Sequence, residues 1–201
     1  MLKLGMNAIL PLAAGMAALL AQPAFAQGGS VSASTYKTTL EFAGCVVNAD
    51  ASGASALLAT VPGSPQADTA VSGLLANKAC NKDKVSASAL RGAVAEQLYL
   101  KQYPAAPAEL TGPPPPFKGS GDADLAYYDI TRCAATRDPL GADMLIRGEL
   151  RSEAEKIAVR RILPVIGACT PEGAKIGFDR EKMRGLIAEG LLVVRKGQGP
   201  N

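Results

Sequence analysis

The feature that most constrains the fold of this chain is an internal repeat. Six residue types recur in the same order and at identical spacing 88 residues later. They are Cys45, Asp50, Gly53, Ala54, Leu57 and Ser64 in the first copy, and Cys133, Asp138, Gly141, Ala142, Leu145 and Ser152 in the second. A second block, R-G-x-x-A-E-x-L at 91–98, returns at 184–191. Repetition over such a length predicts one structural unit that is used twice.

Each copy is predicted to contain four short helices. Apolar residues follow helical spacing, whereas no stretch alternates as a strand would. Asp50 and Asp138 have the side chain and the position of helix N-caps. We therefore predict an all-α protein with one four-helix repeat at 38–103 and another at 124–196. Next to Pro164 we expect a kink or a one-residue bulge, because proline removes a backbone hydrogen bond.

The two copies are separated by a Pro/Gly-rich linker, residues 104–123. Four consecutive prolines, 113–116, favour an extended polyproline II conformation. The composition predicts a spacer. The alternative is a ligand for a proline-recognition domain.

The four cysteines are predicted to form two structural disulfides. Four cysteines allow three pairings. The repeat favours the pairing within each copy, Cys45 with Cys80 and Cys133 with Cys169, because each copy has its own pair. The chain contains no C-x-x-C and no histidine, which argues against a redox-active or zinc-binding set of thiols.

The N-terminus is typical of a secretory signal peptide. Lys3 precedes an apolar stretch at 8–21, and Ala24-Phe25-Ala26 fits a signal peptidase site. We expect cleavage after Ala26, and therefore a periplasmic or secreted protein with flexible tails at 27–37 and 197–201. No later segment is long and apolar enough to predict a membrane span.

Composition excludes several classes of function. Without histidine, neither a Ser-His-Asp triad nor a His-based metal site can form. The formal net charge is only +3 and no basic stripe is present, which argues against nucleic acid as a partner. No phosphate-binding loop, dinucleotide fingerprint or nucleophile elbow is present. The sequence thus predicts no catalytic residue, no cofactor and no metal ligand.

The repeated charges Arg91, Glu96, Arg184 and Glu189 are the candidate polar site. Within each copy the arginine and the glutamate lie five residues apart, about 140° around a helix. They cannot pair within one helix, which needs a spacing of three or four. One hypothesis is reciprocal pairing between helices, Arg91 with Glu189 and Arg184 with Glu96. The alternative is an anion site at the arginines, with a glutamate as acid or base.

Three segments, 42–45, 57–64 and 91–98, resemble a set of uncharacterised exported helical proteins of Gram-negative bacteria. That resemblance implies export and architecture, and no activity. The first hypothesis for function is a non-enzymatic periplasmic protein that binds or scaffolds a protein or a small anionic ligand. The alternatives are a hydrolase or transferase using Arg and Glu in a cleft between the copies, and a stress-related holdase chaperone.

Overall fold

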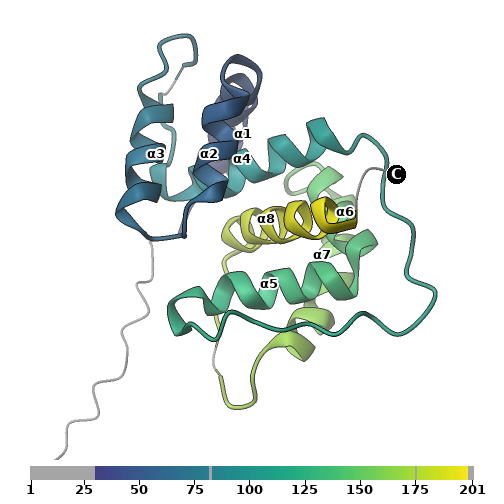
Figure 1. Cartoon of the computed structure of the whole chain (residues 1–201). Coiled ribbons are helices and arrows are strands. Elements are labelled where there is room, and N and C mark those ends of the chain that lie inside the picture. The colour runs from purple at the N-terminus through teal and green to yellow at the C-terminus, as the bar shows by residue number, and fades with distance from the viewer. Residues whose placement is uncertain (1–29, 82, 175, 199–201) are drawn as a thin grey trace, which may run out of the picture.

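The protein is all-α, as the sequence predicts. The computed structural model describes residues 30–81, 83–174 and 176–198, and the expected signal peptide lies outside these ranges. The described residues form eight α-helices and one 3-10 turn, with no strand among them (Figure 1). The helices are α1 (Ala33–Ala49), α2 (Ala51–Ala59), α3 (Pro65–Leu75), α4 (Ala87–Gln102), α5 (Ala126–Arg137), α6 (Pro139–Arg147), α7 (Glu153–Cys169) and α8 (Arg180–Gln198), and the turn η1 (Ala123–Leu125) precedes α5.

The same kinds of cap begin helices whose first residues lie 88 positions apart in the sequence. The carboxylate of Asp50 accepts a hydrogen bond from the backbone N–H of Gly53 at the start of α2, and Asp138 does so from Gly141 at the start of α6. Ser64 and Ser152 cap α3 and α7 in the same way through their hydroxyls. Each such cap contributes about 1 kcal/mol to the stability of the folded protein. These four polar residues therefore set where the helices begin.

Three helices differ in detail from the sequence expectation. The helix α1 begins at Ala33, within the expected tail 27–37, because Ser32 caps it and Tyr36 is buried. The helix α8 continues to Gln198, into the expected tail 197–201. The helix α7 passes through Pro164 as an uninterrupted α-helix, without the one-residue bulge, and the kink that was the other expectation there stays a prediction.

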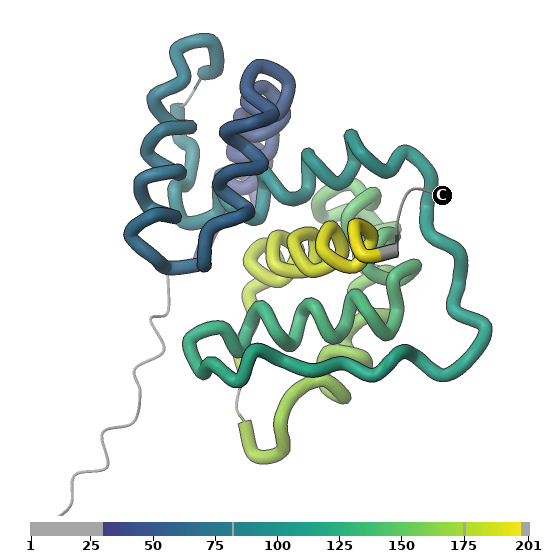
Figure 2. The backbone as a smooth tube through the Cα atoms, viewed as in Figure 1, coloured from purple at the N-terminus to yellow at the C-terminus, as the bar shows by residue number. Residues whose placement is uncertain are grey.

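Two helices, α4 and α8, lie at the centre of the arrangement. The helices α1, α2 and α3 all pack against α4, whereas α5 and α6 pack against α8. The helix α7 covers α5 and α6, and α4 packs directly against α8 (Figure 2). Apolar side chains from both sides form one continuous core, which includes Phe42, Val46, Leu57, Leu90, Leu98, Ile130, Leu145, Ile162, Ile187 and Leu191. The contact between α4 and α8 joins the two sides of this core.

No single helix in the described ranges has both the length and the apolarity needed to cross a membrane. The consecutive helices α1 and α2 together satisfy those criteria, but they meet at an angle of 113°.

Two disulfides connect helices on each side of the linker. Cys45 in α1 is bonded to Cys80 after α3, and Cys133 in α5 is bonded to Cys169 at the end of α7. The pairing predicted from the sequence is thus confirmed. The cysteines of the two pairs are separated by 35 and 36 residues, so the two bonds close loops of nearly equal length.

We predict that replacing Cys133 and Cys169 together by serine lowers the free energy of unfolding by ~3–4 kcal/mol, because the unfolded chain gains the entropy of an open loop. The double replacement of Cys45 and Cys80 is the matched variant and should cost a similar amount. Urea unfolding followed by circular dichroism measures both. Losses below about 1 kcal/mol in both variants would contradict the expectation.

Candidate functional site

The helices α4 and α8 cross with their backbones in contact, at Gly92 and Gly185. A Cβ atom placed on Gly92 would lie 2.6 Å from the Cα of Gly185, and one on Gly185 would lie 2.9 Å from the Cα of Gly92. Any larger residue would force the helices apart, since real Cβ atoms do not approach so closely. The glycine of both R-G pairs is therefore explained by this contact, which also brings the charges beside it within reach of the opposite helix.

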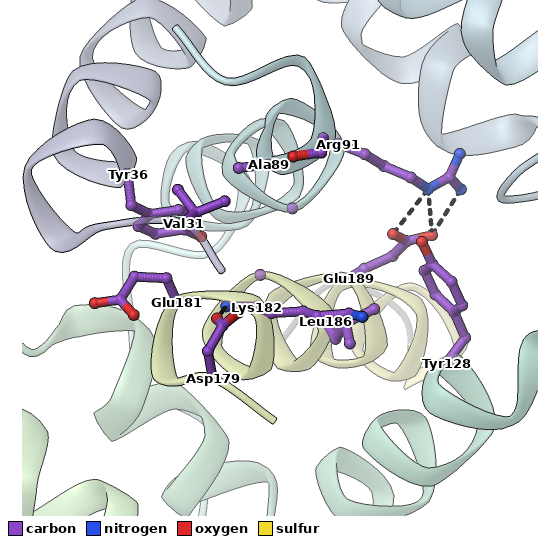
Figure 3. A pocket seen from close by; sticks show the side chains of 13 residues that line it. Val31, Tyr36, Ala89, Arg91, Tyr128, Asp179, Glu181, Lys182, Leu186 and Glu189 are labelled. Atoms are coloured by element: carbon purple, nitrogen blue, oxygen red, sulfur yellow. Dashed lines mark hydrogen bonds and ion pairs between the residues drawn. The ribbon is translucent and has the colours of Figure 1, made fainter. Parts of the chain in front are cut away.

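The repeated charges form two reciprocal ion pairs across this crossing. Arg184 donates from Nε and Nη2 to the carboxylate of Glu96, at 2.9 and 2.6 Å. Arg91 donates from Nε and Nη2 to the carboxylate of Glu189, at 2.9 and 2.7 Å (Figure 3). Both contacts have the forked geometry that makes arginine–carboxylate pairs strong. This is the reciprocal interhelical pairing hypothesised from the sequence.

Arg91 also closes the C-terminal end of α2. Its Nη1 and Nη2 donate to the backbone carbonyls of Leu57 and Leu58, at 2.9 and 3.2 Å, and Nη2 donates to that of Thr60 at 3.0 Å. The last carbonyls of a helix lack partners within the helix, and a positive charge there is favourable. Arg91 thus ties α2, α4 and α8 together.

Arg184 does the same for α6. Its Nη2 and Nη1 donate to the backbone carbonyls of Ile146 and Gly148, at 2.6 and 2.8 Å. A second carboxylate, that of Glu155 on α7, lies 3.3 Å from Nη1. Arg184 therefore connects α4, α6, α7 and α8.

The two ion pairs differ in how far they are buried. The side chains of Arg184 and Glu96 are 3% and 2% exposed, whereas those of Arg91 and Glu189 are 11% and 13% exposed. The hydroxyl of Tyr36 on α1 covers the inner pair and donates to Glu96 at 3.3 Å. The pair formed by Arg91 and Glu189 lines two cavities, which are described below.

In the inner pair, burial and the bonds between the two partners shift each pKa in opposite directions. Burial raises the pKa of Glu96, and the hydrogen bonds and charge of Arg184 oppose that rise. Burial disfavours the charged guanidinium of Arg184, but the bonds and charge of Glu96 outweigh it and the pKa of Arg184 is raised. Burial and the negative charge of Glu96 raise the pKa of Tyr36 well above its ordinary value. Tyr36 therefore stays protonated and acts as the donor.

Two hollows adjoin the outer pair of Arg91 and Glu189. One of about 100 Å³ lies beside the glycine crossing and is lined by Asp179, Lys182 and Tyr128 (Figure 3). The other, of about 250 Å³, lies toward the end of α2 and is also lined by Tyr128. Burial, followed by the charge of Glu189, raises the pKa of Tyr128 to about 12. Both hollows are smaller than typical small-molecule sites of about 300–1,000 Å³.

The arrangement leaves little for acid–base chemistry at the four candidate residues. Every nitrogen of the Arg91 and Arg184 side chains donates to a carboxylate, a hydroxyl or a backbone carbonyl. Within residues 30–81, 83–174 and 176–198, no three Asp, Glu or Cys side chains gather in a way that could hold a metal ion. The site is a structural joint between helices.

Two further residues of this joint were not predicted from the sequence. Tyr36 was assigned to a flexible tail, because one tyrosine ahead of the repeat carries no periodic signal. Glu155 lies outside the repeated R-G-x-x-A-E-x-L block, and its carboxylate faces Arg184. Both act through contacts between helices that are far apart in the sequence.

No protein-family model, no curated protein and no solved structure significantly matches this chain.

We predict that Gly92→Ala lowers the free energy of unfolding by ~1–3 kcal/mol, because the added methyl group overlaps the backbone of α8. The control is Gly73→Ala in α3, where an added Cβ meets no atom within 4 Å. That change should leave stability unchanged or raise it by up to ~1 kcal/mol. Thermal and urea unfolding of both variants measure the difference. Equal effects of the two substitutions would show that the crossing is not tight in solution.

Proposed function

We propose that this chain is a non-enzymatic binding protein of the periplasm or the extracellular space. The proposal rests on one observation. The side chains of Arg91, Glu96, Arg184 and Glu189 are all bonded to other parts of the same chain. An acid–base catalyst needs a carboxylate that is free to face its substrate. Here Glu96 and Glu189 each hold an arginine. The repeated motif then holds α4 and α8 together, and the function of the protein depends on its surface.

The proposed location is supported by the cysteines and by the first residues of the sequence. Two disulfides and no free cysteine in the described part of the chain are compatible with an oxidising compartment. The signal-like sequence that ends at Ala26 points to the same compartment.

We also infer that the two sides are copies of one four-helix unit. Supporting this, α2 and α6 have the same length and begin 88 residues apart. The positions of two glycines at the helix contacts also support the inference of two copies. Where α1 meets α4, Gly44 faces Gln97, and where α5 meets α8, Arg132 faces Gly190. By the repeat spacing Gly44 corresponds to Arg132, and Gln97 corresponds to Gly190, so the small residue has changed sides.

The surface offers apolar side chains both beside the joint and away from it. Val61 and Val193 are 60% and 49% exposed and line the same 250 Å³ hollow. Ile157 and Leu163 are exposed on α7. Apolar residues that gather beside a hollow are typical of interaction surfaces, whereas scattered ones are ordinary. Binding is therefore the function class that the geometry favours.

The proposal is tested by photo-crosslinking in the cells that produce the protein. A photoreactive phenylalanine analogue is placed singly at Val61, at Ile157 or at Thr111, which lie on different parts of the surface. We expect a discrete adduct from at least one position and none from another, because a binding protein uses a defined face. A holdase would instead give a broad mixture of adducts from every position.

Absence of adducts from all three positions would contradict the proposal. A catalytic activity of the purified chain would also contradict it, if Glu189→Gln abolished that activity while the far-ultraviolet circular dichroism and the melting temperature stayed those of a folded protein. The second outcome would favour the hydrolase or transferase alternative.

A further inference from the structure

The segment between α4 and α5 is fastened to the second half of the protein near both of its ends. Near its start, Pro107 is buried, and the carboxylate of Glu109 pairs with Arg161 of α7 at 2.9 Å. Near its end, the backbone N–H and the hydroxyl of Ser120 both donate to Asp129 of α5, at 2.6 and 2.7 Å. The chain between these points runs alongside α5 (Figure 2). It is therefore a strap with fixed ends.

The middle of the strap has little conformational freedom. Proline fixes its own φ near −65°, and a residue that precedes proline is pushed toward ψ of about 120–160°. Residues 112–115 each precede a proline. The run 113–116 therefore favours polyproline II geometry, which has three residues per turn and no internal hydrogen bonds. In that geometry Pro113 and Pro116 are one turn apart and share an edge.

This run faces solvent and is flanked by further recognition features. All four prolines are exposed, as is Leu110 on their N-terminal side. The ring of Phe117 is held over the guanidinium of Arg132, with 5.2 Å between the guanidinium carbon and the ring centroid. Lys118 is exposed and forms no ion pair with any residue in the described ranges. The strap thus presents P-x-x-P-x-K, with an unpaired positive charge at its end.

We propose that residues 110–118 are a docking epitope for a partner protein with an aromatic-lined proline-recognition groove. This inference rests on the proposed function as a binding protein and names the chemistry of its partner. Prolines one turn apart insert between aromatic side chains in such grooves. An acidic side chain at the edge of the groove pairs with Lys118.

The fastened ends strengthen this interaction. A free peptide loses conformational entropy when it binds, whereas a segment that is already held in its bound shape loses less. The contact of Glu109 with Arg161 and that of Phe117 with Arg132 lie on either side of the proline run. The folded chain should therefore bind more tightly than the same nine residues as a free peptide.

The first test is a titration of the folded chain with an isolated SH3 domain that prefers P-x-x-P-x-K/R ligands, followed by calorimetry. We expect saturable binding that the double variant Pro113→Ala/Pro116→Ala weakens at least tenfold, and that Lys118→Glu also weakens. The matched control is Pro104→Ala, an exposed proline outside the run, which should change the affinity less than twofold. The free peptide 110–118 should bind several-fold more weakly than the chain. Binding that the double variant leaves unchanged, or no binding at all, would overturn the proposal.

The second test uses the crosslinker at Thr111 in cells. We expect a single adduct that disappears in the Pro113→Ala/Pro116→Ala background and persists with Pro104→Ala. Adducts at Val61 or Ile157 but none at Thr111 would overturn the epitope and leave the proposed binding function standing. Absence of adducts at every position would overturn both.

Discussion

The contact between two glycines, Gly92 on α4 and Gly185 on α8, is the constraint on which the rest of the structure depends. Because no side chain separates the two backbones there, the arginine of each helix reaches the glutamate of the other. The same arginines extend to the ends of α2 and α6. The helices α1–α3 pack on α4, and α5 and α6 pack on α8. One close approach therefore positions almost every helix.

The charges at this joint fix the position of α4 against α8 more than they raise the free energy of unfolding. A buried ion pair gains little over well-packed apolar residues, because both charges lose their water. Removing one partner is costly, since the other charge is then left buried alone. Arg184 and Glu96 form such a buried pair, and Tyr36 and Glu155 lie against it. The forked hydrogen bonds permit only one register of α4 against α8, and this explains why the motif is present on both helices.

Much of this fold could be predicted from the sequence because its signals are local or repeated. The caps at Asp50 and Asp138 follow from residue type and position, and the cysteine pairing follows from the repeat. The reciprocal ion pairs could be hypothesised since five residues separate Arg and Glu within each helix. Tyr36 and the fastening of the proline-rich strap could not be predicted, because both depend on side chains from distant helices that the folded chain brings together.

The central claim is that the α4–α8 joint makes the two halves one cooperative unit. Native-state hydrogen exchange of Glu96→Gln, compared with the unaltered chain, tests it most directly. The substituted residue lies on α4, but the account predicts that the most protected amides of α6 and α8 lose protection together with those of α1 and α4. Since breaking a buried pair costs about 3–5 kcal/mol, the loss should exceed about a hundredfold in all four helices. A loss confined to α1–α4, with α5–α8 as protected as before, would contradict the account.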